Sequence, residues 1–265
     1  MNNTEKTNIP AKTLAETGFV EADTTLFSEL FDNKNLAAKL LEAMHLMSAG
    51  IWEGDISKDF PSHPGKIVIA RDFLEHVSLF RLIDQPLKFG RPVILGIDGR
   101  CSAGKTTLAK IITKVYGGDF ISIDDFYLPF DLRTPERMAI PGGHIHYERF
   151  IEQILKPIKA GETQLEYEKY NCFTKTSAPL TADLNSKVIV IEGSYSLHPW
   201  IRELYSLTTF LTIEDSLQKE RILKRNGSER LEVFKNTWIP FEDNYRKAYD
   251  IDKYCNLLIT QGNLC

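Results

Sequence analysis

The chain has 265 residues, of which 43% are hydrophobic and 26% charged. These fractions are typical of a globular protein and exclude the composition of an intrinsically disordered chain. The net charge of −4 and the lack of long Lys or Arg runs exclude a strongly basic surface, so no nucleic-acid partner is predicted. No apolar stretch reaches the roughly 18 residues of a membrane span, and the N-terminus lacks a signal-peptide pattern. Neither membrane insertion nor secretion is therefore predicted.

The cysteines are widely scattered and form no C-x-x-C pair. In a chain of this size without a secretory pattern, such spacing favours unpaired thiols in a reducing compartment. We therefore expect a cytoplasmic protein. The four residues are Cys101, Cys172, Cys255 and Cys265.

The N-terminal third shows two kinds of pattern. Residues 1–26 have little apolar periodicity, which predicts a flexible lead-in. Apolar residues then recur at helical spacing over residues 36–47 and again over residues 69–80, and Pro86 is expected to end the second run. We predict a helical N-terminal element over residues 27–88 that packs on the main domain or on a second copy of the chain.

After Pro92, short β-rich apolar runs alternate with helical patterns, and a main domain is predicted over residues 89–265. This alternation predicts an α/β fold with a doubly wound, mostly parallel sheet covered on both faces. Ligands of such sheets bind beyond the carboxyl ends of the strands. Strands are predicted at residues 93–95, 120–123, 188–191, 210–213 and 257–259, and helices at 108–116, 147–159, 216–225 and 232–245.

The first predicted strand leads into a segment that fits the G-x-x-x-x-G-K-[ST] pattern over residues 99–106. Glycines let such a loop curl so that its N–H groups face phosphate oxygens, and the following helix adds its positive end. We expect Lys105 to reach the β- and γ-phosphates of ATP and Thr106 to bind Mg²⁺. The predicted nucleotide-binding residues are Gly99, Arg100, Cys101, Ser102, Ala103, Gly104, Lys105, Thr106 and Thr107.

Two alternatives for this loop are less favoured. A dinucleotide-binding G-x-G-x-x-G fingerprint starting at Gly96 would need glycine at the positions held by Asp98 and Cys101. Cys101 could make the loop sensitive to oxidation, but a role as a small filler is favoured. A nucleoside triphosphate therefore remains the expected ligand.

Acidic residues directly follow two of the predicted strands. Asp124 and Asp125 come after the second strand, and Glu192 after the third. Carboxyl ends of parallel strands meet at one edge, so Asp124 can accept the proton of an acceptor hydroxyl, and both Asp124 and Glu192 can help to hold Mg²⁺. The alternative is that the aspartates form a turn and Glu192 only caps its strand.

Phosphoryl transfer also needs cations around the transferred group. Arg221 and Arg225 lie at i, i+4 spacing on one predicted helix face, before a flexible segment over residues 226–230 that suits a lid. A solvated helix face is an equally good explanation for each arginine alone. His144 and His146 lack nearby Cys or carboxylate partners, so loop or substrate contacts are favoured over a metal site.

These motifs together resemble the uridine kinase and phosphoribulokinase family over residues 90–260. The resemblance rests on residues 96–107, 122–127 and 191–193 and on the arginine-bearing helix. Within this family, the chain most resembles the bacterial uridine kinase-like branch. The segments that carry this closer resemblance are residues 133–137, 141–143, 147–150, 192–199 and 238–240.

The resemblance implies a P-loop kinase domain with a lid, ATP and Mg²⁺ as ligands, Asp124 as general base and Glu192 near the metal. It also implies a nucleoside pocket near Tyr170 and Asn171, where the family carries a Tyr-Asp pair. His146 stands where the family places an aspartate that holds the ribose hydroxyls. The predicted substrate-binding residues are Tyr127, His146, Tyr170 and Asn171.

The favoured hypothesis is an ATP-dependent kinase that phosphorylates the 5′-hydroxyl of uridine or cytidine, with a homodimer as a further expectation. The same chemistry could serve pantothenate, glycerate or a sugar phosphate, and Lys169 and Lys175 would supply cations for a phosphorylated acceptor. A non-catalytic nucleotide-binding regulator is a third hypothesis. Asp124 and Glu192 argue against it, because a binding protein needs no base at this edge.

Overall fold

The computed structural model describes residues 19–23, 66–70 and 76–261, and the chain divides into two compact units, Met1–Val77 and Ser78–Asn263. In the first unit, β1 (Phe19–Asp23) and β2 (Lys66–Ala70) pair antiparallel, with Phe19 opposite Ala70. The predicted helix over residues 36–47 lies outside the described residues.

The predicted helix over residues 69–80 is wrong at its start. Lys66–Ala70 is a strand, because three successive β-branched residues, isoleucine, valine and isoleucine, favour extended backbone over helix. The helical part is α6 (Val77–Lys88), which continues through Pro86. A proline in the last turn removes a single intrahelical hydrogen bond, which explains why the helix does not end before it.

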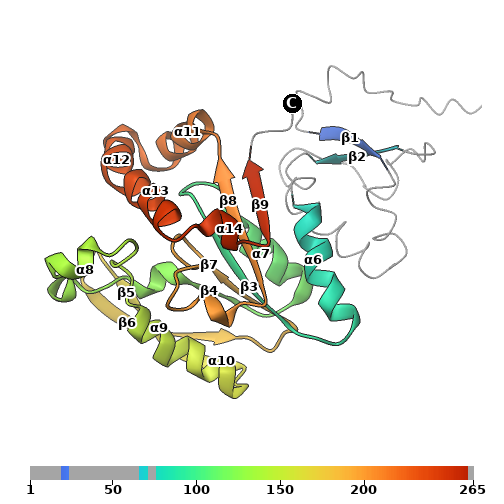
Figure 1. Cartoon of the computed structure of the whole chain (residues 1–265), viewed down its shortest axis with the longest axis horizontal. Helices are drawn as coiled ribbons and strands as arrows, with labels where there is room; N and C mark the ends of the chain where they lie inside the picture. Colours follow the sequence, from blue (N-terminus) through green and yellow to red (C-terminus); the bar gives the residue numbers. More distant parts are fainter. Residues whose placement is uncertain (1–18, 24–65, 71–75, 262–265) are drawn as a thin grey trace, which may run out of the picture. The chain divides into compact units, whose positions relative to one another are not determined.

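The second unit is built on a parallel sheet with the strand order β4-β7-β3-β8-β9 (Figure 1). After the central β3, the chain forms β4 and β7 on one side and then β8 and β9 on the other, which is the doubly wound order. The predicted α/β class is confirmed. The strands are β3 (Val93–Gly99), β4 (Phe120–Ser122), β7 (Val188–Glu192), β8 (Leu207–Ile213) and β9 (Leu257–Gln261).

Helices follow the strands much as predicted. The helix α7 (Lys105–Tyr116) starts directly after the glycine-rich loop and buries Leu108, Ile112 and Val115.

In the described part of the chain, no helix combines the length and apolar character needed to cross a membrane. The other helical segments are η2 (Ile123–Phe126), η3 (Phe130–Leu132), α8 (Pro135–Ala139), α9 (Tyr147–Phe150), η4 (Ile151–Leu155), α10 (Lys156–Ala160), η5 (Arg202–Leu204), α11 (Asp215–Asn226), α12 (Ser228–Val233), η6 (Phe234–Trp238), α13 (Ile239–Ala248) and α14 (Ile251–Tyr254).

A β-hairpin that the sequence analysis missed connects α10 to β7. Its strands β5 (Gln164–Asn171) and β6 (Thr176–Asp183) pair antiparallel, with Asn171 opposite Thr176. In β5, Leu165 and Tyr167 are buried between exposed neighbours. This two-residue alternation is the signal that could have revealed the hairpin.

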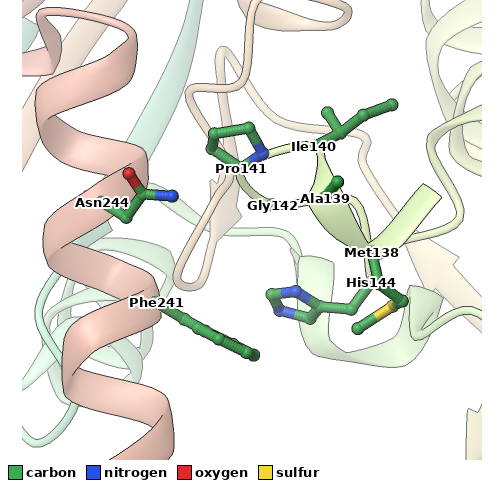
Figure 2. Close-up of a pocket in the computed structure, with 8 residues that line it drawn as sticks. All are labelled: Met138, Ala139, Ile140, Pro141, Gly142, His144, Phe241 and Asn244. Atoms are coloured by element: carbon green, nitrogen blue, oxygen red, sulfur yellow. The ribbon is translucent and has the colours of Figure 1, made fainter. Parts of the chain in front are cut away.

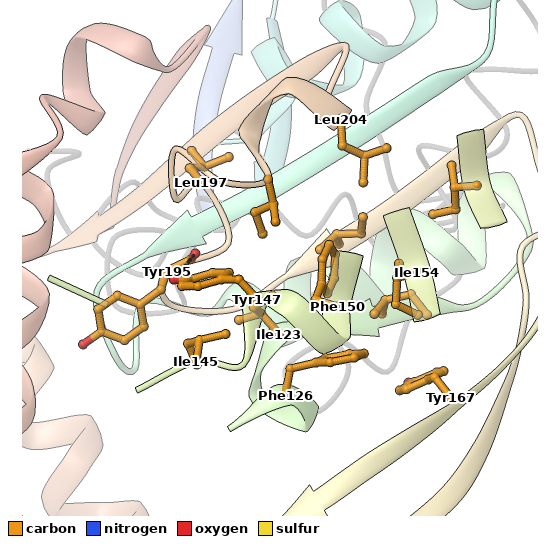
Figure 3. Packing of buried hydrophobic residues seen from close by; sticks show 14 of the residues in the cluster. Ile123, Phe126, Ile145, Tyr147, Phe150, Ile154, Tyr167, Tyr195, Leu197 and Leu204 are labelled. Carbon is orange, nitrogen blue, oxygen red and sulfur yellow. Dashed lines mark hydrogen bonds between the residues drawn. The ribbon is translucent and has the colours of Figure 1, made fainter. Parts of the chain in front are cut away.

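The hairpin packs under the segment that carries Asp124. The ring of Phe126 contacts Phe150 edge to face at 5.2 Å and stacks on Tyr167 at 5.4 Å between centroids (Figure 3). All three rings belong to one buried hydrophobic cluster. The core therefore fixes η2 between the sheet and the hairpin, so that the acidic pair at the end of β4 has a defined position.

Candidate active site

The loop after β3 has the curled backbone that its pattern predicts. Gly99, Ser102 and Gly104 have positive φ angles of 150°, 62° and 91°. A Cβ atom at Gly99 would lie only 2.2 Å from the Leu211 carbonyl oxygen, so only glycine fits there. The loop turns directly into α7, whose first residue is Lys105.

The side chain of Lys105 folds back onto this loop. Its Nζ donates to the carbonyl oxygens of Gly99 at 2.7 Å and Arg100 at 2.9 Å, and to Ser194 Oγ at 3.0 Å. These three acceptors match the three N–H bonds of an ammonium group. For Lys105 to bind a phosphate, phosphate oxygens would have to replace these acceptors.

Glu192 lies between two hydroxyl groups at the same edge of the sheet. Ser122 Oγ donates to its Oε1 at 2.9 Å, and Thr106 Oγ1 donates to its Oε2 at 3.2 Å. Ser122, which the sequence analysis missed, is placed there because it pairs with Glu192 across β4 and β7. Burial and the charge of Asp124 raise the pKa of Glu192, and hydrogen bonds and Lys105 oppose this shift.

These oxygen donors fit Mg²⁺, which proteins hold through one or two carboxylates together with water and substrate phosphates. Glu192 is buried beside the like charge of Asp124, so a cation here would relieve an unfavourable arrangement. Within the described residues, no group of three or more His, Cys, Asp and Glu side chains is placed to hold a metal ion.

The two aspartates at the end of β4 have different surroundings. Asp125 is buried, accepts a hydrogen bond from Tyr167 at 3.1 Å and pairs with Lys169 at 2.6 Å. Asp124 is exposed, and no hydrogen bond or ion pair within the described part of the chain occupies its carboxylate. Protein atoms still surround it closely, and this desolvation raises its pKa against the opposing charges of Lys105 and Lys169. Only Asp124 is therefore available to a substrate.

The predicted lid helix α11 touches the loop. Arg221 donates to the Ser102 carbonyl oxygen at 3.3 Å and to Gln261 Oε1 at 3.2 Å. The exposed Arg225 instead donates to its neighbour Asn226 at 2.8 Å. The structure thus brings Arg221, but not Arg225, to the phosphate loop.

Further contacts from α11 fix the loop. Gln218 Nε2 donates to the Cys101 carbonyl oxygen at 3.0 Å, and Arg100 pairs with Asp215 at 2.7 Å. Burial, together with the charge of Glu242, raises the pKa of the Cys101 thiol to about 12. A thiol that stays protonated is a poor nucleophile, which supports the interpretation of Cys101 as a small filler.

Asp98 joins the loop to two other elements. Its carboxylate accepts hydrogen bonds from the backbone N–H groups of Gly99 at 2.6 Å, Tyr195 at 3.0 Å and Leu197 at 3.0 Å, and from the Tyr245 hydroxyl at 2.7 Å. Burial raises its pKa to about 6, although these hydrogen bonds and Lys105 oppose the shift. The sequence analysis considered Asp98 only as a failed fingerprint position and missed this role.

Ser194 and Glu242 also lie in the site and were missed. Glu242, from α13, accepts the Cys101 N–H at 2.8 Å and the Ser194 hydroxyl at 2.8 Å. No local pattern marks Glu242, because it reaches the loop only through the fold. Ser194 directly follows the Glu192-Gly193 pair, and that position was its only sequence signal.

The predicted substrate residues lie on several elements. Tyr170 is buried in β5, while Asn171 accepts the N–H groups of Phe173 and Thr174 and so forms the hairpin turn. His146 Nδ1 accepts the Arg149 N–H at 3.2 Å and caps α9. The side chains of Asn171 and His146 thus serve local backbone structure.

Tyr127 faces an aromatic group around His144. The two rings stack at 5.8 Å between centroids, and His144 also contacts Tyr195 at 4.4 Å and Trp238 at 5.7 Å. Burial lowers the pKa of His144 to about 4, so its imidazole is neutral at pH 7.

A pocket of about 50 Å³ lies beside this aromatic group (Figure 2). Phe241 and Asn244 from α13 face His144 and the segment before it across the space. The lining combines apolar and polar surface, and His144 and the Asn244 amide are its polar side chains. The lining residues are Met138, Ala139, Ile140, Pro141, Gly142, His144, Phe241 and Asn244.

Comparisons with known proteins were made for sequence and structure. None of the protein-family models matches the chain. It is 24% identical over 189 residues to a uridine kinase from Ligilactobacillus salivarius, covering 65% of this chain and 86% of the relative. It is 27% identical over 154 residues to a uridine kinase from Lactiplantibacillus plantarum, covering 54% and 72%.

A phosphoribulokinase from Synechocystis is 26% identical over 148 residues, covering 53% of this chain and 43% of the relative. A solved structure described as a possible uridine kinase from Bacillus stearothermophilus has a TM-score of 0.47 at 20% identity and covers 69% of this chain and 99% of that one. The curated relatives share the kinase description that the phosphate loop predicts. In sequence, the chain is similar to members of the uridine kinase and phosphoribulokinase family of P-loop kinases.

Proposed function

We propose that this kinase transfers the γ-phosphate of ATP to a small-molecule hydroxyl group, most specifically the 5′-hydroxyl of uridine or cytidine. The observation that carries the proposal is the Asp124 carboxylate, which is exposed and unpaired within the described residues at the sheet edge that holds the phosphate loop. The names of the curated relatives support a nucleoside as acceptor.

The phosphate loop supplies the donor side of the reaction. Its backbone N–H groups and the N-terminal end of α7 favour the polyphosphate of ATP. Lys105 would exchange its carbonyl contacts for phosphate oxygens, and Arg221 already lies on the loop to stabilise developing charge. When bound, Mg²⁺ would neutralise charge on the phosphates, and Thr106 and Glu192 are the residues that would hold it.

Asp124 acts on the acceptor side. As the acceptor oxygen attacks the γ-phosphorus, its hydroxyl proton passes to the Asp124 carboxylate, and the bond from phosphorus to the β-γ bridging oxygen breaks to leave ADP. The raised pKa of Asp124 makes it a stronger base than an ordinary aspartate. Lys105 and, to a smaller extent, Lys169 shift that pKa in the opposite direction and so favour the charged carboxylate.

The surroundings of Tyr127 support a planar acceptor. Tyr127 follows Asp124 in the same motif and stacks on His144, beside the pocket that Phe241 lines. Aromatic faces and a neutral imidazole suit a heterocyclic ring, because they offer stacking and hydrogen bonding without a fixed charge.

A second candidate is a phosphorylated acceptor such as a sugar phosphate. Lys169 reaches Asp125, the neighbour of the proposed base. Near the hairpin, the Arg133 guanidinium lies 4.0 Å and the Lys175 ammonium 5.4 Å from the centre of the Phe130 ring. Cations at and near the hairpin would favour an anionic group on the acceptor.

The test is ADP release from ATP and Mg²⁺ with uridine, cytidine, pantothenate, glycerate or ribulose 5-phosphate. Turnover with uridine or cytidine that collapses in Asp124→Asn supports the proposal, and turnover only with ribulose 5-phosphate supports the second candidate. ATP binding without acceptor-stimulated ADP release across the panel would contradict both and favour a nucleotide-binding regulator. Asp131→Asn, a change of the same type at an exposed position, is the control.

A further inference from the structure

A carboxylate accepts a hydrogen bond from one of the backbone N–H groups of the phosphate loop that could bind an anion. Glu242 reaches the loop from α13, and its Oε2 accepts the backbone N–H of Cys101 at 2.8 Å. The side chain is buried, and burial raises its pKa while Lys105 and the Cys101 N–H oppose the shift. An inward N–H of such a loop is the kind of group that a phosphate oxygen would use.

The same carboxylate is connected to the phosphate-binding lysine. Its other oxygen, Oε1, accepts the Ser194 hydroxyl at 2.8 Å, and Ser194 Oγ accepts a hydrogen bond from Lys105 Nζ at 3.0 Å. Glu242 therefore binds one loop N–H directly and the loop ammonium through one hydroxyl group. Both are groups that ATP needs.

Other contacts already hold the loop in shape. Asp98 binds its first N–H group, Gln218 binds the Cys101 carbonyl, and Arg221 binds the Ser102 carbonyl. In addition, α13 is fixed to the site independently, because Tyr245 donates to Asp98 at 2.7 Å. Shaping the loop therefore does not account for a buried negative charge at the place where phosphate binds.

We propose that Glu242 is a carboxylate latch, which holds the Cys101 N–H and, through Ser194, Lys105 until the phosphates of ATP displace it. The inference rests on the proposed function, because it takes ATP as the competing ligand. The inference makes Glu242 a positioning residue whose negative charge lowers the affinity for ATP.

The helix that carries the latch also faces the pocket. Phe241 and Asn244, on either side of Glu242 in the sequence, line the space beside His144 (Figure 2). Any shift of α13 that releases Glu242 therefore changes the pocket walls.

The test is calorimetric binding of ATP and ADP with Mg²⁺, without acceptor, to the full chain and to Glu242→Gln. The glutamine keeps an oxygen for the Cys101 N–H but removes the charge. ATP is expected to bind this variant roughly tenfold more tightly than the wild type, with a smaller gain for ADP. Asp243→Asn removes the same charge one residue along α13, where the side chain has no hydrogen bond or ion pair with another described residue, and should bind like the wild type.

Ser194→Ala is a second variant, because it cuts the link to Lys105 and leaves the loop contact; it should bind ATP more tightly than the wild type by a few-fold. Unchanged or weaker ATP binding by both variants, with normal binding by the wild type, would overturn the latch alone. A lack of ATP binding by all of these proteins would overturn both the latch and the proposed function.

Discussion

At the scale of single residues, the site contains a group of buried or surrounded carboxylates that lack full cationic compensation. The pKa values of Asp98, Asp124, Glu192 and Glu242 are all raised, and desolvation is the main cause in each case. Such groups cost folding free energy when they are charged. Their presence at one edge of the sheet is typical of a site arranged for ligands rather than for stability.

The sequence predicted only part of this group. Asp124 and Glu192 each directly follow an apolar strand, so the strand pattern was sufficient to find them. Asp98 is the second-last residue of β3, but its four hydrogen-bond donors include Tyr195, Leu197 and Tyr245, which only the fold brings to it. Residues that act through distant partners leave no local spacing to recognise.

Asp124→Asn is expected to lower kcat by roughly 100- to 10,000-fold, because the amide cannot accept the hydroxyl proton. ATP binding should be retained, since no hydrogen bond or ion pair within the described residues ties this side chain to the loop. Steady-state kinetics with the active acceptor and calorimetric ATP binding check the two parts. A kcat within a few-fold of the wild type would exclude Asp124 as the base.

The raised pKa of Asp98 predicts that the stability of the fold falls as the pH rises. Its pKa is about 6 in the folded chain, against an ordinary value of 3.8, so the folded state favours the protonated form of Asp98. The stability that this preference contributes is lost as the pH rises through about 6. Between about pH 4 and 7, Asp98→Asn should gain stability relative to the wild type by about 3 kcal/mol, the free-energy equivalent of this pKa shift. Urea unfolding at several pH values measures the difference. A difference that does not vary with pH would contradict this account.

At the scale of elements, the strands were predictable because parallel strands buried on both faces form continuous apolar runs. The hairpin of β5 and β6 was not recognised, since its strands bury only alternate residues and β6 is exposed along most of its length. The hairpin nevertheless supports the site. Tyr167 and Lys169 fix Asp125, and Phe126 stacks on Tyr167.

The role of this packing can be tested at Phe126. Its ring is fully buried, so Phe126→Ala should lower the free energy of unfolding by about 3–5 kcal/mol. Phe173→Ala is the matched control, because that ring is 85% exposed at the hairpin tip and its loss should cost less than about 0.5 kcal/mol. Chemical denaturation of both variants gives the comparison. Equal losses would show that the hairpin does not depend on this cluster.

At the scale of the whole molecule, the order of the strands creates the site. Because β7 lies between β4 and β3 and is parallel to both, the phosphate loop, Asp124 and Glu192 reach one edge from segments far apart in the sequence. The helices α11 and α13 then add Arg221 and Glu242. The homodimer remains a prediction, which light scattering of the purified chain would test.

The most direct test of the central claim follows the phosphorus atoms of ATP by ³¹P NMR in the presence of Mg²⁺ and either uridine or cytidine. The account predicts that the γ-phosphate signal is lost in step with the growth of a phosphate monoester signal on the nucleoside and of the ADP signals. Loss of the γ-phosphate only to inorganic phosphate, or no loss with either nucleoside, would contradict it.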